Sequence, residues 1–290
     1  METARASRTA VLVCQGRAVA DGRAAVGRFA DPVAVRLLRD DERRAVEQAR
    51  APELPSDVRE RLVVEMLRAT AQGMVARTVA IDEAITGAGH RQVVILGAGL
   101  DTRPWRLGAL RGPVTFAVDH PASQAEARER SAGMTPVGRL EFVPVDLSTD
   151  DLGVALTRAG HDPAAATTWV WEGVVPYLTD DDVRATVAAL AERSAPGSVL
   201  VVQYQTRSWT ATAGRRLSRV VLRLTRTADP LTAEPWRSLW SPKAMARMLA
   251  EHGFPVEEDD DLLTIAGRLG SPATRRRSLA NGRVAVATRP

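Results

Sequence analysis

Three acidic side chains stand at or near the ends of predicted strands. Asp119, Asp146 and Glu172 close the apolar runs 114–119, 140–146 and 167–173. A carboxylate accepts hydrogen bonds from both hydroxyls of a diol, or from an amino group, better than a neutral side chain does. A single strand-end aspartate is more often a helix cap. Three acids at one edge of a sheet can instead converge on one ligand.

A glycine turn at the same edge of the sheet would expose backbone peptide groups to a ligand. The stretch 91–103 contains a buried strand around the apolar run 93–96, followed by Gly97 and Gly99. Glycines at this place let the chain turn sharply and let a ligand approach the peptide groups closely. Packing between a strand and the next helix is the simpler explanation of such a turn, and the turn alone does not exclude it.

The residues after the turn distinguish between classes of ligand. A dinucleotide-binding loop would place a third glycine where Thr102 or Arg103 stands, and Pro104 follows immediately, so NAD and FAD are disfavoured. A P-loop needs a Gly-Lys-Ser/Thr sequence, but the only lysine of the chain is Lys243. The remaining class is a nucleoside without phosphates, and S-adenosyl-L-methionine is the commonest cofactor of that class.

Composition limits the other function classes. The chain has 290 residues, 45% of them hydrophobic, which is enough for one large core. Its net charge is +4, but arginines are scattered along the chain and no block of basic and aromatic residues is present, so a nucleic-acid partner is not expected. The single cysteine, Cys14, excludes an internal disulfide and fits a reducing cytoplasm. We expect no signal peptide, no membrane span and no metal site.

The pattern of elements predicts how the acids and the glycine turn are positioned. From Gln92 onward strands and helices alternate, which indicates an α/β fold with a mostly parallel sheet and helices on both faces. We expect a single domain with four parts: a helical N-terminal extension (1–57), a cofactor-binding core (58–204), a substrate-covering insertion (205–240) and a C-terminal part of the core (241–290). Further predictions are a long helix over 58–86, a helix over 259–269 and a final strand over 282–288.

Several blocks of the sequence resemble one known family. The runs 77–82 and 92–103 and the later blocks 118–121, 145–147 and 172–178 match in order and spacing, and Arg17-Ala18 and the run 29–32 match as well. Together they resemble the leucine carboxyl methyltransferase family, and within it the actinobacterial branch of S-adenosyl-L-methionine-dependent methyltransferases. The resemblance implies a Rossmann-like class I methyltransferase fold with a seven-stranded sheet, and S-adenosyl-L-methionine as cofactor with S-adenosyl-L-homocysteine as product.

The resemblance also implies roles for individual residues. Arg77 would hold the carboxylate of the cofactor, Asp119 its ribose, Asp146 and Leu147 its adenine, and Glu172 would lie beneath its amino group. Arg17 would reach the cofactor from the N-terminal extension. The complete set of cofactor-binding positions implied in this way is Arg17, Arg77, Gly97, Ala98, Gly99, Asp101, Asp119, His120, Asp146, Leu147, Glu172 and Gly173.

The chemistry of the acceptor is less constrained. A carboxylate acceptor is already ionised, whereas a hydroxyl acceptor needs a general base. His120 and His161 lie near predicted strand ends or loops without a visible orienting partner, and His252 is expected to cap a helix. We therefore favour O-methylation of a carboxylate on a small molecule or a peptide C-terminus, in specialised metabolism, with Tyr204 and Arg207 as candidate substrate contacts.

Three alternatives stay open at this stage. The first is a hydroxyl O-methyltransferase that uses a histidine base, and the second is a carboxyl methyltransferase acting on a tRNA nucleoside. The third is a cofactor-binding protein without catalysis. The sequence makes no prediction of the oligomeric state or of the acceptor's identity.

Overall fold

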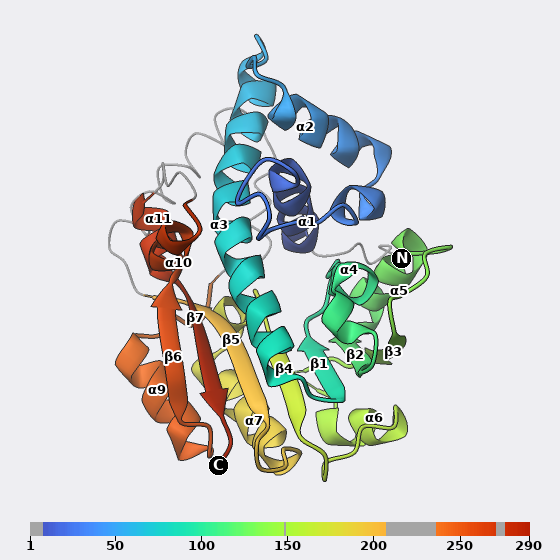
Figure 1. Ribbon diagram of the computed structural model, residues 1–290, viewed down its shortest axis with the longest axis vertical. Coiled ribbons are helices and arrows are strands. Elements are labelled where there is room, and N and C mark those ends of the chain that lie inside the picture. The colour runs from blue at the N-terminus through green and yellow to red at the C-terminus, as the bar shows by residue number, and fades with distance from the viewer. Residues whose placement is uncertain (1–7, 148, 207–235, 271–275) are drawn as a thin grey trace.

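The sheet of the protein has the predicted mixed α/β architecture. The computed structural model describes residues 8–147, 149–206, 236–270 and 276–290. Within these ranges the sheet has seven strands in the order β3-β2-β1-β4-β5-β7-β6 (Figure 1). β1 to β5 are parallel, and β7 runs antiparallel between β5 and β6. The strands are β1 Gln92–Leu96, β2 Val114–Asp119, β3 Arg139–Pro144, β4 Thr167–Trp171, β5 Val199–Gln205, β6 Val256–Asp261 and β7 Gly282–Thr288.

Helices cover both faces of the sheet. One face packs against α6 (Leu152–Arg158), α7 (Asp180–Glu192) and α9 (Pro242–Glu251) around the buried Trp169 and Trp171. The other face packs against α3 (Val58–Ala88), α10 (Leu262–Arg268) and α11 (Arg276–Asn281) through Val93, Ile95 and Val170. Apolar contact on both faces explains why these strands read as unbroken apolar runs rather than alternating ones.

The N-terminal extension forms a layer of its own on α3. It consists of α1 (Arg8–Ala20), the 3₁₀ turn η1 (Ala34–Leu37) and α2 (Asp40–Arg50), which share a separate apolar cluster with α3 (Figure 1). Asp57 caps α3 by accepting from the backbone N–H groups of Arg59 and Glu60, and Gly89 ends it in a left-handed conformation. The division of 1–57 from the core stays a prediction, although helices do fill this part of the chain.

Other short elements connect the strands to the site. α4 (Arg103–Arg106) and η2 (Gly108–Leu110) follow β1, α5 (Pro121–Arg130) follows β2, and η3 (Val175–Tyr177) follows β4. The final strand has the bounds predicted for it, but the helix predicted over 259–269 was wrong in its first part. β6 continues through Asp261, and that side chain caps α10, which begins at Leu262. The acids that suggested a helix start are therefore mostly strand residues paired with β7.

The insertion 205–240 lies largely outside the described residues, so its predicted role as a cover for the substrate stays a prediction. In the described part of the chain, no helix is both long and apolar enough to cross a membrane.

Candidate active site

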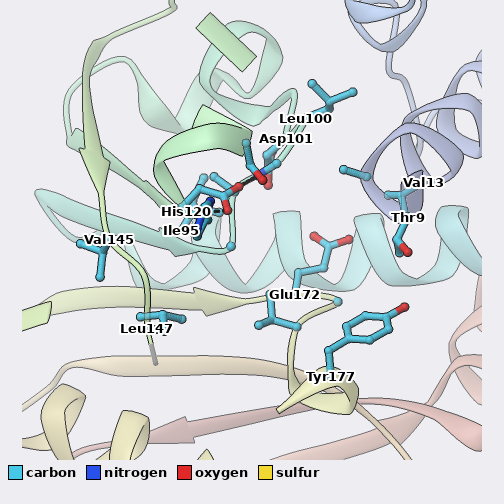
Figure 2. Close-up of a pocket in the computed structure, with 18 of the residues that line it drawn as sticks. Thr9, Val13, Ile95, Leu100, Asp101, His120, Val145, Leu147, Glu172 and Tyr177 are labelled. Carbon is cyan, nitrogen blue, oxygen red and sulfur yellow. Dashed lines mark hydrogen bonds between the residues drawn. The ribbon is translucent and has the colours of Figure 1, made fainter. Parts of the chain in front are cut away.

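A pocket of about 390 Å³ opens at the carboxyl ends of β1, β2 and β4, beneath α1. Figure 2 shows His120, Val145 and Leu147 at one end, Thr9, Val13 and Tyr177 at the other, and Glu172 between them. The structure brings every predicted cofactor-binding position to the lining of this pocket: Arg17, Arg77, Gly97, Ala98, Gly99, Asp101, Asp119, His120, Asp146, Leu147, Glu172 and Gly173. Residues from six separate parts of the chain therefore share one cavity.

The glycine turn has a conformation that requires glycine. Gly97 and Gly99 have φ angles of 63° and 50°, in the left-handed region. A Cβ atom on Gly97 would lie 2.2 Å from Cγ2 of Val174, and one on Gly99 would lie 3.1 Å from Cβ of Ala10. The turn is thus closed in by the loop after β4 on one side and by α1 on the other, which explains why both glycines are needed.

Asp119 is held by the turn itself. Its Oδ2 accepts from the backbone N–H of Gly99, and its Oδ1 accepts from the N–H of His120 at 2.7 Å. Burial raises the pKa of this carboxyl, and the two N–H donors only partly oppose that effect. A carboxylate offers about four acceptor sites, so both oxygens keep capacity for hydroxyl donors in the pocket.

Glu172 carries the charge in the middle of the pocket. Its side chain is 8% exposed, and its two oxygens lie 2.6 Å from Nε of Arg77 and 2.6 Å from Nη1 of Arg103. Burial acts to raise the pKa of Glu172, but the guanidinium groups of Arg103 and Arg77 outweigh it and hold that pKa well below its usual range. Glu172 is therefore ionised at any pH at which the protein would work.

Arg77 and Glu172 are not fully satisfied by each other. Nε of Arg77 and Oε1 of Glu172 form an ion pair, but neither atom makes a hydrogen bond of good geometry within the described residues. Buried polar atoms that lack a well-aligned hydrogen bond are uncommon in folded proteins, and a ligand that supplies the missing bond is one explanation for them. A zwitterionic amino-acid group fits this pair, because its ammonium can donate to the carboxylate and its carboxylate can accept from the guanidinium.

Arg17 attaches α1 to the glycine turn. Its Nη2 donates to the carbonyl of Leu100 at 2.6 Å, and its Nε lies 3.5 Å from Oδ2 of the fully buried Asp31. The same Asp31 oxygen accepts from the hydroxyl of Thr102 at 2.6 Å. These contacts fix α1 over the pocket, so that Thr9, Val13 and Arg17 form part of its wall.

Of the two candidate substrate contacts only Tyr204 lies within the described residues, and it does not line this pocket. Tyr204 is 0% exposed, and its hydroxyl donates to Oδ2 of Asp259 at 2.6 Å, beside β6. This is a correction: Tyr204 points into the layer between the sheet and α9, so the structure gives no support for its role as a substrate contact. Arg207 lies outside the described residues.

The histidines differ in where they lie relative to the pocket. His161 is buried between Phe116 and Trp169, its Nε2 lies 3.0 Å from the hydroxyl of Thr167, and it does not line the pocket. His252 closes α9, with Nδ1 2.8 Å from the carbonyl of Met248, as its predicted capping role requires. Of these candidates only His120 lines the pocket.

His120 is already engaged at the start of α5. Its Nδ1 accepts from the backbone N–H of Ala122 at 3.3 Å, which places the proton of the neutral ring on Nε2. That nitrogen lies 3.9 Å from Oδ2 of Asp146. A ring in this state has no unshared nitrogen with which to take a proton from a substrate.

Sequence reasoning missed four residues that hold the site together. Asp31, Asp82, Arg103 and Arg106 make ion pairs with one another or with pocket residues. All but Arg106 fall within the blocks that carried the family resemblance, so the signal was present, but spacing alone does not identify their partners. Thr9 and Val13 had no signal, because the run before residue 20 shows no clear period.

Comparisons with known proteins agree with this geometry. A sequence model described as leucine carboxyl methyltransferase matches residues 10–191. A relative from Mycobacterium avium strain 104, named as a candidate S-adenosyl-L-methionine-dependent methyltransferase, is 34% identical over 203 residues, which cover 68% of this chain and 66% of the relative. One of the same name from Mycobacterium bovis BCG Pasteur 1173P2 is 36% identical over 230 residues, which cover 74% of this chain and 71% of that protein. The chain thus spans slightly less than two thirds of the length of the first relative.

Solved structures share the fold over nearly the whole chain. A DUF574 family protein from Streptomyces avermitilis has a TM-score of 0.61 at 16% identity and covers 98% of both chains. A candidate methyltransferase from Thermobifida fusca has a TM-score of 0.58 at 16% identity, covering 99% of this chain and 96% of that one. At this identity the likeness concerns the fold alone. The family match extends over more than half of the sequence, and the chain therefore belongs to the leucine carboxyl methyltransferase family, with a Rossmann-like class I methyltransferase fold.

Proposed function

We propose that the protein is an S-adenosyl-L-methionine-dependent O-methyltransferase whose acceptor is a carboxylate on a small molecule or a peptide C-terminus. The cofactor part of the proposal rests on one observation, that Asp119 and the Arg77–Glu172 ion pair line the same pocket. Asp119 would accept from the ribose hydroxyls, and Arg77 and Glu172 would hold the amino-acid end. When bound, the cofactor supplies a methyl group on a sulfonium, ready for in-line displacement.

The ends of the pocket have different tasks under this proposal. Val145 and Leu147 form an apolar wall at the end where Asp146 would accept from the adenine amino group. Thr9, Val13 and Tyr177 lie at the opposite end, where we place the acceptor (Figure 2). α1 covers the pocket there and excludes water, and alignment of two reacting groups in such a site can contribute about 7 kcal/mol or more.

The state of the histidines favours a carboxylate over a hydroxyl acceptor. A hydroxyl must lose its proton during transfer, and general-base catalysis contributes about 10²- to 10⁴-fold. His161 is buried away from the pocket, and Nδ1 of His120 is used in capping α5. A carboxylate is already ionised and needs no base, so the positions of these two histidines are compatible with that acceptor.

Two measurements test the proposal. Calorimetry should show binding of S-adenosyl-L-homocysteine by the purified protein, and failure to bind it would end the methyltransferase proposal. A panel of carboxylic acids incubated with methyl-labelled cofactor should then yield labelled ester with at least one acid. With that acid and a saturating concentration of cofactor, which removes any effect of His120 on cofactor binding, we expect His120→Ala to keep kcat within about threefold, because no base is lost. A loss of a hundredfold or more in kcat would contradict the argument that the acceptor needs no histidine base.

A further inference from the structure

One arginine outside the pocket contacts three carboxylates at once. Arg103 is 0% exposed and does not line the pocket. Its Nε lies 2.6 Å from Oδ1 of Asp82, and its Nη1 lies 2.6 Å from Oδ2 of Asp101 and 2.6 Å from Oε2 of Glu172. The three partners come from α3, the glycine turn and the loop after β4. A planar guanidinium serves these three acceptors from two nitrogens held in a fixed fork, whereas the three donors of an ammonium share a single nitrogen.

Two of these carboxylates face the ligand. Asp101 and Glu172 line the pocket, and because both contact the same nitrogen, their nearest oxygens are roughly 5 Å apart or less. Two negative charges at that distance repel each other strongly unless a cation lies between them. Arg103 is the cation that intervenes.

Asp82 in turn orients Arg103. It lies on α3, its side chain is 17% exposed, and it does not line the pocket. Its second oxygen accepts from Nη1 of Arg106 at 2.6 Å, so the carboxylate is fixed on both sides. Arg103, Arg77 and Arg17 are the charged groups that act on Glu172. These arginines are linked in turn, directly or through one another, to a second set of charged groups: Asp31 before η1, Asp82 of α3, Asp101 of the glycine turn and Arg106 of α4.

We propose that Arg103 is a positioning residue that holds Asp101 and Glu172 together as a double acceptor for the cationic end of the ligand, and that Asp82 positions Arg103. Naming that end as the ammonium group of S-adenosyl-L-methionine rests on the proposed function. Arg103 itself touches no ligand. Replacing Arg103 should therefore weaken binding of the amino-acid part of the ligand, whereas other residues bind the nucleoside part.

Calorimetry with two ligands separates positioning from general loss of structure. S-adenosyl-L-homocysteine carries the ammonium group, and 5′-methylthioadenosine is the same nucleoside without the amino-acid end. At pH 7 we expect Arg103→Met to weaken the first ligand about a hundredfold and the second by less than threefold, and Arg103→Lys to recover part of the loss by restoring the charge. Equal weakening of both ligands, or no weakening of either, would overturn the inference.

A milder pair of variants covers the case in which Arg103→Met does not fold. Asp82→Asn should weaken S-adenosyl-L-homocysteine about three- to tenfold and leave methylthioadenosine unchanged. The neighbouring Glu83→Gln is the matched control, since the ion pair that Glu83 makes among the described residues is with Arg28, and both side chains are exposed. The same loss in both variants would contradict a specific role of Asp82.

A titration of the ligand-free protein tests the inference independently of the cofactor. Carbon NMR of the Glu172 carboxyl should show a midpoint well below the ordinary range of a glutamate in the unmodified protein. In Arg103→Met the midpoint should move upward, because a cation that holds the pKa of Glu172 down is lost. Identical titrations in the two proteins would overturn the inference. Failure of the unmodified protein to bind either nucleoside would instead overturn the proposed function.

Discussion

Replacing Gly97 by alanine should be more costly than replacing a glycine of the same backbone conformation elsewhere. Gly97 and Gly89 both have a φ angle of 63°, but a Cβ on Gly97 would lie 2.2 Å from Cγ2 of Val174, whereas a Cβ on Gly89 would meet nothing within 4 Å. The left-handed conformation costs a residue with a side chain about 1–2 kcal/mol. Part of this is offset by the lower entropy of unfolded alanine, which leaves about 1 kcal/mol for Gly89→Ala.

The clash with Val174 adds a second contribution at Gly97 only. Overpacking in a tight site costs about 1–3 kcal/mol, so we expect Gly97→Ala to lose about 2–4 kcal/mol in free energy of unfolding. In a chain of this size each kcal/mol lowers Tm by roughly 2 °C. Urea unfolding, followed by circular dichroism, would measure both variants against the unmodified protein.

A double-mutant cycle identifies the source of the difference. Val174→Ala removes the atom that the new Cβ would strike, so Gly97→Ala should cost only about 1 kcal/mol in that background. The coupling between the two sites should then be about 1–3 kcal/mol. Equal losses for Gly97→Ala and Gly89→Ala, or additive losses in the cycle, would refute the argument that the loop after β4 closes against the glycine turn.

Three further predictions concern charge and hydrogen bonding. Asp119→Asn should weaken binding of S-adenosyl-L-homocysteine about tenfold or more in calorimetry. Because burial raises the pKa of Asp119, the affinity of the unmodified protein should fall as the pH drops through that raised pKa. An affinity that does not change with pH would contradict the role of Asp119. Burial lowers the pKa of His161 to about 4, so the unfolded protein protonates this histidine at a higher pH than the folded protein does. The free energy of unfolding should therefore decrease by about 3 kcal/mol as the pH falls from 6.5 to 4. In His161→Gln, acid unfolding should lack this part of the loss. Tyr204→Phe should lose about 1–2 kcal/mol in urea unfolding through its bond to Asp259, with unchanged cofactor affinity, and a changed affinity would restore a role for Tyr204 at the site.

The sequence by itself determined the edge of the sheet at which the ligand pocket lies. Alternating strands and helices imply parallel strands, and parallel strands bring their carboxyl ends to one edge. Asp119, Asp146 and Glu172 therefore had to lie near Gly97 and Gly99 once the strands were recognised, and the structure places all five at one pocket. The family resemblance added Arg77, which periodicity would have left on the surface of a helix.

The tertiary structure alone decided which way side chains point and which charges meet. β5 is buried on both faces, so its sequence does not show that Tyr204 turns away from the pocket. Arg103 and Glu172 are 69 residues apart, and their contact exists only because α4 and the loop after β4 meet below the glycine turn. Ion pairs of this kind depend on distance in space, since charge acts over a few ångströms whatever the separation along the chain. Local patterns in a sequence report strands and turns, and they carry no record of such partners.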